Sequence, residues 1–239
     1  MTGPAVVTMH LWGVPARAVP RAVAHMATDR GPLRATPGLR FAKLLGTGSG
    51  RTFTARDADL RRWGLLAVWD DAAAASAFEQ GPVPGRWRRF SAEEWVARLE
   101  PLAARGRWSG QEPFGHPRPR AWEGPVAAIT RARLVLRRAA RFWAAVPPVS
   151  ADLHRTAGLR LALGIGEAPV GLQGTFSVWD SGSALNAFAY RRTAHVAVVD
   201  RTAREGWYAE ELFARFAVRS TSGTLDGVDP LGSAASGRP

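Results

Sequence analysis

Residues 190–199, YRRTAHVAVV, hold the side chains of this sequence that are best suited to chemistry. On a helical wheel His195 lies in the middle of an apolar face, and a neutral imidazole there can bind a metal. Arg191 and Arg192 lie one turn earlier, on either side of it. Arginine at the edge of a buried stripe reaches solvent or meets an anion. The apolar face around His195 consists of Ala184, Phe188, Val198 and Val199.

An upstream predicted strand, residues 159–166, carries small residues on one face. Alternation places Arg160, Ala162, Gly164 and Gly166 on that face and leucine or isoleucine on the other. Small residues leave room above a sheet, so a helix histidine facing them suits a flat cofactor. Haem needs a neutral imidazole ligand, an apolar slot and cations for its propionates.

Simpler explanations of the same residues stay open. A lone histidine on an apolar helix face is often a hydrogen-bonded core residue, and glycines in a strand can serve close helix packing. The glycine-rich segment 46–53 lacks the Gly-Lys-Ser/Thr ending of a phosphate-binding loop. The acidic pairs at 70–71, 93–94 and 210–211 are interpreted as helix caps and solvated faces. Asp70 and Asp180 are the expected N-caps.

An internal repeat places these residues in a larger architecture. Each half contains a strand, a helix, a strand beginning Gly-Leu-Arg, a strand ending Val-Trp-Asp, a helix and a last strand. This βαβ-βαβ order is the ferredoxin-like unit. We therefore predict an α+β protein whose two tandem ferredoxin-like repeats pack as a pseudo-dimeric α/β barrel. The matching blocks are 37–48 with 157–168, 63–79 with 173–189, and 100–105 with 210–215.

The repeat also defines the expected domains. Residues 1–108 form the first repeat, the proline- and glycine-rich residues 109–124 a connector, and residues 125–218 the second repeat. Residues 219–239 contain few apolar side chains and are expected to be a disordered tail.

Two positions distinguish the halves. His195 corresponds to Gly85 in the first half, so the scaffold itself does not require an imidazole there. Gly164 corresponds to Leu44, which makes the second half the more open one. We therefore expect the second repeat to be the haem-binding half.

Composition limits the classes of function. The chain of 239 residues has no cysteine, which excludes disulfides, thiolate ligands and cysteine nucleophiles. Its formal charge is +12, but Lys43 is the only lysine and the arginines are scattered, so we expect no nucleic-acid partner. An acidic protein such as a ferredoxin would suit a positive surface. With no signal peptide or membrane-spanning stretch apparent, we expect a soluble cytoplasmic protein.

Five blocks of the sequence resemble the spheroidene monooxygenase family of carotenoid biosynthesis. The resemblance implies a haem-containing monooxygenase that introduces keto oxygen into an acyclic carotenoid, using O2 and electrons from a reductase and a ferredoxin. Related haem proteins with the dimeric α/β barrel, including aldoxime dehydratases and chlorite dismutases, hold iron with a histidine in the C-terminal half. His195 matches that expectation. The blocks are 41–53, 63–70, 164–181, 187–199 and 207–218.

These inferences give each candidate residue an expected role. His195 would bind the iron of haem b through Nε2, with Arg191 and Arg192 as propionate partners. Catalytic groups on the distal side would come from the second-half sheet. The distal candidates are Arg160, Gln173, Thr175 and Ser177, and the cofactor-binding candidates are His195, Arg191, Arg192, Phe188, Ala162, Gly164, Gly166 and Val199.

Alternatives remain for the chemistry and the partners. One is a haem enzyme acting on an N–O substrate, like an aldoxime dehydratase; another is a cofactor-free monooxygenase of the antibiotic-biosynthesis type. The expected substrate is a small apolar molecule, a carotenoid or another secondary metabolite. We also consider peripheral membrane contact and a homodimer.

Overall fold

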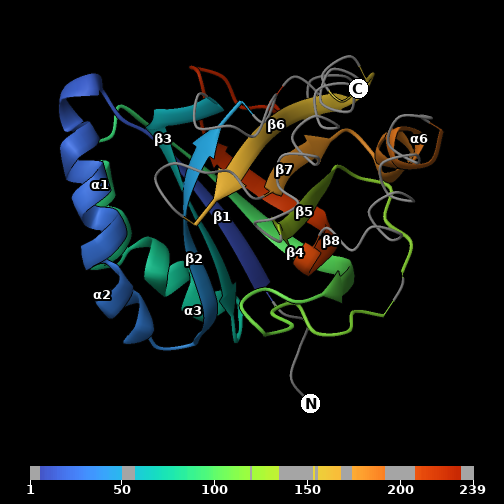
Figure 1. Cartoon of the computed structure of the whole chain (residues 1–239), viewed down its shortest axis with the longest axis horizontal. Coiled ribbons are helices and arrows are strands. Elements are labelled where there is room, and N and C mark those ends of the chain that lie inside the picture. Colours follow the sequence, from blue (N-terminus) through green and yellow to red (C-terminus); the bar gives the residue numbers. More distant parts are fainter. Residues whose placement is uncertain are drawn as a thin grey trace.

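Eight antiparallel strands close into a barrel in the computed structural model, with helices on its outside (Figure 1). The strand order around the barrel is β1-β3-β2-β6-β7-β5-β8-β4. Among the described residues, no helix is long and apolar enough to cross a bilayer. The structure describes residues 6–49, 57–118, 120–134, 153, 156–167, 174–191 and 208–232.

The elements fall into two sets in chain order. The first half comprises β1 (Val6–Gly13), the 3-10 turn η1 (Ala16–Ala18), α1 (Val19–Thr28), α2 (Arg30–Arg34), β2 (Leu39–Gly48), β3 (Ala58–Trp69), α3 (Ala72–Glu79), α4 (Pro82–Arg88) and β4 (Glu93–Gly106). The second half comprises β5 (Val126–Leu134), β6 (Leu159–Gly166), β7 (Gly174–Trp179), α6 (Gly182–Arg191) and β8 (Tyr208–Gly223).

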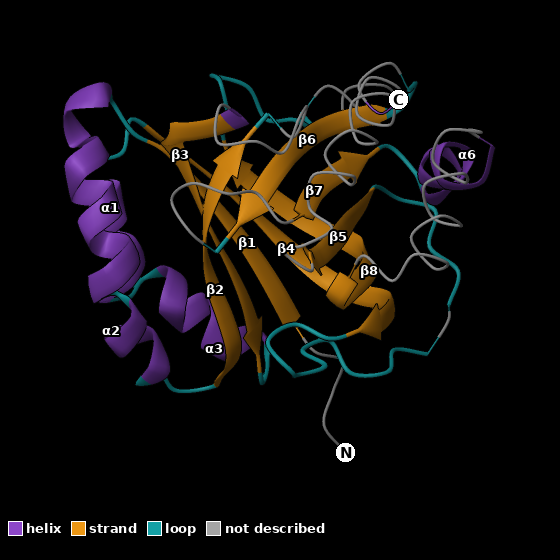
Figure 2. Ribbon diagram, in the orientation of Figure 1, coloured by secondary structure: helices purple, strands orange, loops and turns teal. Residues whose placement is uncertain are grey.

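Each half is a four-stranded sheet with the ferredoxin-like order. The first half runs β4-β1-β3-β2 and the second runs β8-β5-β7-β6. The halves join at two seams, where β2 pairs with β6 and β4 pairs with β8. Helices α1, α2 and α3 lie on one side of the barrel and α6 lies on the opposite side (Figure 2). The predicted pseudo-dimeric α/β barrel is confirmed.

The repeat seen in the sequence is also present in the strand pairing. Val6 pairs with Trp69, and Val126 pairs with Trp179 at the matching position of the second half. Both halves break register at the second residue of the Gly-Leu-Arg strand. The preceding glycine has φ +73° in the first half and φ +83° in the second, a backbone conformation that favours glycine. The offsets of 120 and 110 therefore identify equivalent positions.

The inward face of the strands forms one apolar core. Met9, Trp95, Phe176 and Phe216 are fully buried members of the cluster that fills the barrel. Leu163 and Ile165 of β6 also belong to it, so alternation turns Ala162 and Gly164 outward. A flat cofactor near β6 must therefore lie outside the barrel, on the helix side of the sheet.

The connector and the chain end both pack against the barrel. Phe114, in the expected connector, and Trp108, the last residue of the expected first repeat, are buried in the barrel core. The expectation of disorder over residues 219–239 is wrong for residues 219–232. Strand β8 continues to Gly223 in pairing with β4, and Leu225 behind it is 3% exposed. This segment is ordered despite its low apolar content because its backbone forms hydrogen bonds with β4.

Candidate functional site

The outer face of the first-half sheet is filled by large side chains. Trp12, Trp63 and Trp87 are fully buried between the sheet and its helices. The rings of Trp12 and Trp87 stack with centroids 4.9 Å apart, and Trp87 donates its indole N–H to the buried Asp29. Indole rings therefore fill the space between this part of the sheet and α4.

The equivalent positions of the second half carry smaller residues without an aromatic ring. By the same offsets, Trp12 becomes Ala132, Trp63 becomes Gln173 and Trp87 becomes Ala197. Each replacement removes an indole ring. Of these three positions, the structure describes Ala132, which is 9% exposed.

Strand register shows how far the small residues extend. Thr175 pairs with Thr130 on one side and Gly164 on the other. The equivalent first-half row is His10, Leu65 and Leu44. The next row, Ser177 between Ala128 and Ala162, is small in both halves. We call the six residues of the two second-half rows the small-residue shelf: Ala128, Thr130, Ala162, Gly164, Thr175 and Ser177.

The shelf combines small apolar groups with hydroxyls. Ser177 is 6% exposed and its Oγ accepts a hydrogen bond from Trp179 Nε1 at 3.0 Å. That bond uses an acceptor site and leaves the Ser177 proton free to be donated. Thr175 is half-buried and Thr130 is exposed. The face can therefore contact a flat apolar group and present three hydroxyl groups to it.

Helix α6 lies beside the shelf because its apolar side packs on β7. Phe188 is buried, and its ring centroid is 5.6 Å from that of Trp179. The first half repeats this contact with Phe78 and Trp69, at 4.8 Å. Phe188 thus occupies a scaffold position that also borders the candidate site.

Arg160 stands at the edge of the shelf in an ion pair. Its Nε lies 2.5 Å from Asp180 Oδ1, and this hydrogen bond raises the pKa of the guanidinium. The first half contains the same pair, with Arg40 Nε 2.6 Å from Asp70 Oδ1. Because both halves share this pair, it belongs to the scaffold. A distal role for Arg160 would require the pair to open.

The other predicted residues lie at or beyond the limits of the described structure. Gly166 is buried at the seam, where it pairs with Gly46 of β2. Arg191 is the last residue of α6. Gln173, Arg192, His195 and Val199 lie outside the described residues.

Sequence reasoning missed a charged cluster that closes one end of the barrel. Arg131, with a side chain 4% exposed, bridges Glu167 at 2.9 Å and Glu210 at 2.6 Å. Glu167 also accepts from Lys43 Nζ and Trp108 Nε1. Burial by itself raises the pKa of Glu167. These hydrogen bonds and the charges of Lys43 and Arg131 lower that pKa by a larger amount, so the net shift is downward.

Glu210 holds the connector in this cluster. It accepts from the backbone N–H groups of Ser109 and Gly110, at 3.0 and 2.7 Å. Burial raises its pKa, and the backbone hydrogen bonds together with Arg131 lower it more, for a net decrease. The expectation that the 210–211 pair is merely a solvated face is therefore wrong for Glu210, whose side chain is 13% exposed. No local spacing in the sequence brings these residues together.

Comparison with known proteins gives relatives over most of the chain. No family model matches it. It is 38% identical over 221 residues to spheroidene monooxygenase from Rhodobacter capsulatus, covering 90% of each chain. It is 41% identical over 198 residues to spheroidene monooxygenase from Rubrivivax gelatinosus, covering 82% of this chain and 75% of the relative.

The fold has relatives among solved structures. A crystal structure of aldoxime dehydratase matches 90% of this chain and 82% of its own, with a TM-score of 0.57 and 10% sequence identity. At that identity the match establishes a shared fold.

Proposed function

Because the chain belongs to the spheroidene monooxygenase family, we propose that it is a haem-dependent monooxygenase with its cofactor on the small-residue shelf. Membership makes it an oxidoreductase, an oxygenase of the spheroidene monooxygenase type that uses O2 and a small-molecule substrate. The cofactor, the substrate class and the residue roles below are our proposals.

The observation that carries the haem proposal is the difference between the two outer sheet faces. A porphyrin needs a broad apolar surface without projecting side chains. The row Thr130, Thr175 and Gly164 has smaller side chains, two of them with hydroxyl groups, where the first half has His10, Leu65 and Leu44. The chemistry of the residues present therefore fits the cofactor.

The residues beyond α6 complete the proposed donor set. In a helical reading His195 shares a face with Phe188, whose ring packs against β7. His195 would hold the iron through Nε2, while Arg191 and Arg192 would pair with the propionates. Val199 would extend the apolar contact. Haem held in this way would supply the iron chemistry that activates O2.

The chain's own hydroxyls give the shelf its proposed distal chemistry. Ser177 already accepts from Trp179, so its proton can be donated to an oxygen atom above the sheet. Thr175 lies one row away on the same face and can donate in the same way. Gln173 would extend this polar line, and Arg160 would join it only if it left Asp180.

We propose an acyclic carotenoid or a similar apolar metabolite as the substrate. The family supports this class, and an apolar shelf suits a polyene better than a charged molecule. The electrons would come from a ferredoxin and its reductase, because the net charge of +12 favours an acidic partner.

Oxygen uptake tests the reaction. Purified protein supplied with haem, a reductase, a ferredoxin and an acyclic carotenoid should consume O2 and place its oxygen in the product. Labelled O2 and mass spectrometry of the product measure this. Turnover of an aldoxime without O2 or external electrons would instead support the second candidate, which the fold shared with aldoxime dehydratase favours.

The absorption spectrum tests the proposed iron ligand. Protein loaded with haem should show a Soret band that shifts or collapses in His195→Gly, and added imidazole should restore it. His116→Gly, in the connector, is the control and should leave the band unchanged. A colourless wild-type protein after haem supplementation would contradict the proposal.

A further inference from the structure

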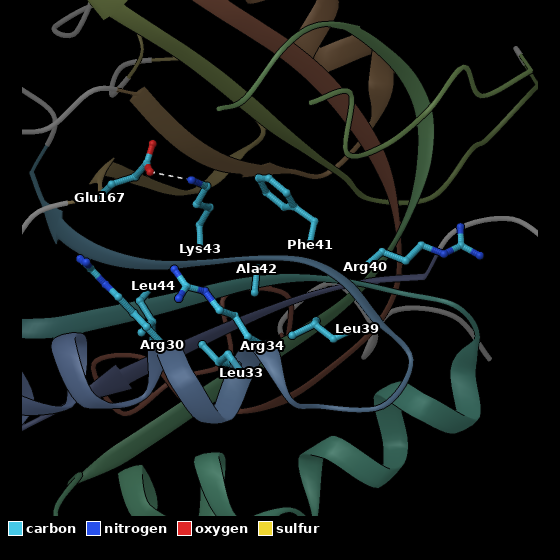
Figure 3. Close-up of a pocket in the computed structure, with 10 residues that line it drawn as sticks. All are labelled: Arg30, Leu33, Arg34, Leu39, Arg40, Phe41, Ala42, Lys43, Leu44 and Glu167. Carbon is cyan, nitrogen blue, oxygen red and sulfur yellow. Dashed lines mark hydrogen bonds and ion pairs between the residues drawn. The ribbon is translucent and has the colours of Figure 1, made fainter. Parts of the chain in front are cut away.

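A groove of about 500 Å³ lies between α2 and β2, on the outside of the first half. Figure 3 shows that Arg30 and Arg34 extend from α2 toward β2, while Arg40 points away at the other end. The groove thus has two basic ends and an apolar middle. Its apolar lining is Leu33, Leu39, Phe41, Ala42 and Leu44.

The positive charge of the groove is only partly neutralised. Lys43 pairs with Glu167 at 2.7 Å, and Arg40 pairs with Asp70. Arg30 and Arg34 have no carboxylate within ion-pair distance among the described residues. The neighbouring acid, Asp29, is 1% exposed and is already bound by Arg86 and Trp87.

The positive surface continues beyond the groove onto α1. Helices α1 and α2 follow each other along one side of the barrel (Figure 1). Arg17 of η1 and Arg21 of α1 are exposed, and Asp29 is the one acidic residue in residues 16–36. Val23, 39% exposed, adds an apolar side chain to the same helix. A basic segment of this length suits an extended anionic surface better than a single small ion.

We propose that this groove binds the phosphate of an anionic phospholipid and docks the first half onto a negatively charged bilayer. Arg30 and Arg34 lie four residues apart, and two guanidinium groups one helical turn apart can share one phosphate through paired hydrogen bonds. Leu39, which is partly exposed, contacts the apolar part of the lipid next to the headgroup, and the buried Leu33 and Leu44 form the floor of the groove. Arg17 of η1 and Arg21 of α1 add attraction to neighbouring headgroups.

Vesicle co-sedimentation of the full-length protein tests this site. The protein should bind vesicles of phosphatidylcholine mixed with phosphatidylglycerol, and should not bind phosphatidylcholine alone. Arg30→Gln combined with Arg34→Gln should weaken binding about 25-fold, because each basic residue at an anionic surface contributes about fivefold. Both side chains are exposed, so the fold should be retained, which circular dichroism checks.

A second double variant separates the groove from net charge. Arg89→Gln with Arg118→Gln removes the same two charges at exposed sites outside the groove lining. It should weaken binding by about threefold or less, since long-range attraction is screened within a Debye length of about 10 Å. Haem loading, measured on the same samples, should be equal in all three proteins, which keeps this test independent of the proposed function.

Three results would overturn the proposal. The first is equal loss of binding in the two double variants, which would mean that net charge alone attracts the vesicles. The second is equal binding to neutral and anionic vesicles. The third is full displacement by millimolar glycerol phosphate, which would make the groove a site for a free anion instead of a bilayer contact.

Discussion

His10 and Glu94 form a buried acid–base contact that shows how single residues fix the first half. His10 is fully buried, and its Nδ1 lies 3.8 Å from Glu94 Oε1. Glu94 also accepts from Trp12 Nε1 at 2.9 Å and Arg88 Nε at 2.6 Å. The expectation that residues 93–94 are caps and solvated faces is therefore wrong for Glu94, which contacts three partners from two elements, β1 and α4.

The pKa of Glu94 makes the stability of this half depend on pH. Burial raises that pKa, but His10 and Arg88 lower it to about 2 from 4.5. A lowered carboxyl pKa stabilises the fold above pH 4.5, and this contribution is lost as the pH falls from 4.5 toward 2. We expect Glu94→Gln to lose about 2–3 kcal/mol at pH 7 and to flatten the pH dependence in that window.

Urea unfolding at a series of pH values measures this effect. The adjacent Glu93→Gln is the control, because its carboxylate accepts from the backbone N–H of Gly227 in an exposed setting. It should keep the wild-type pH dependence. Identical pH profiles for the two variants would show that Glu94 does not carry the acid sensitivity.

Several elements could be predicted from the sequence because their patterns are local. The repeated Val-Trp-Asp strand ends and Gly-Leu-Arg strand starts predicted the strands of both sheets.

The predicted helix caps were wrong by one residue. Asp71 caps α3 by accepting from Ala74 N at 2.8 Å, because Asp70 is already held by Arg40. In α6 the Ser181 hydroxyl takes the same position as a cap for Ala184 N.

The end of β8 could not be predicted because its stability comes from distant partners. Residues 220–223 pair with 95–98 of β4, more than one hundred residues earlier. Asp229, in the turn that follows, accepts from Trp95 Nε1 at 3.1 Å and Thr221 Oγ1 at 2.9 Å. This polar segment has the composition of a flexible tail, although it pairs with β4 and binds the side chain of Trp95.

The Asp229 contact gives a test at the scale of this element. Asp229→Ala leaves the indole N–H of the fully buried Trp95 without its acceptor, which should cost about 1–3 kcal/mol of unfolding free energy. Chemical denaturation followed by tryptophan fluorescence measures the loss.

A neighbouring acid provides the matched control. Asp226 pairs with Arg62, but its side chain is 73% exposed. Asp226→Asn removes this charge and keeps a residue that tolerates the φ of +55° at this position, so it should cost under about 1 kcal/mol. A loss for Asp226→Asn as large as that for Asp229→Ala would mean that the turn is held by charge alone.

Across the whole molecule, one scaffold is used in two ways. The first half buries Trp12, Trp63 and Trp87 under its helices. The second half has Ala132 at the position of Trp12, and the row Thr130, Thr175 and Gly164 where the first half has His10, Leu65 and Leu44. The sequence could predict this asymmetry at Gly164, because Leu44 is its repeat equivalent. It could not predict the Arg131 cluster, whose members meet only when the barrel closes and the connector packs across its end.

Haem titration of a variant that refills the shelf tests the central claim most directly. Thr175→Leu installs the residue that the first half carries at Leu65, so the strand should tolerate it while its side chain occupies the porphyrin surface. Thr28→Leu adds the same bulk at an exposed helix position. In a titration followed at the Soret band, Thr175→Leu should bind haem about tenfold more weakly than the wild type. Thr28→Leu should bind haem with wild-type affinity. Unchanged affinity in a folded Thr175→Leu protein would contradict the placement of the cofactor on the second-half sheet.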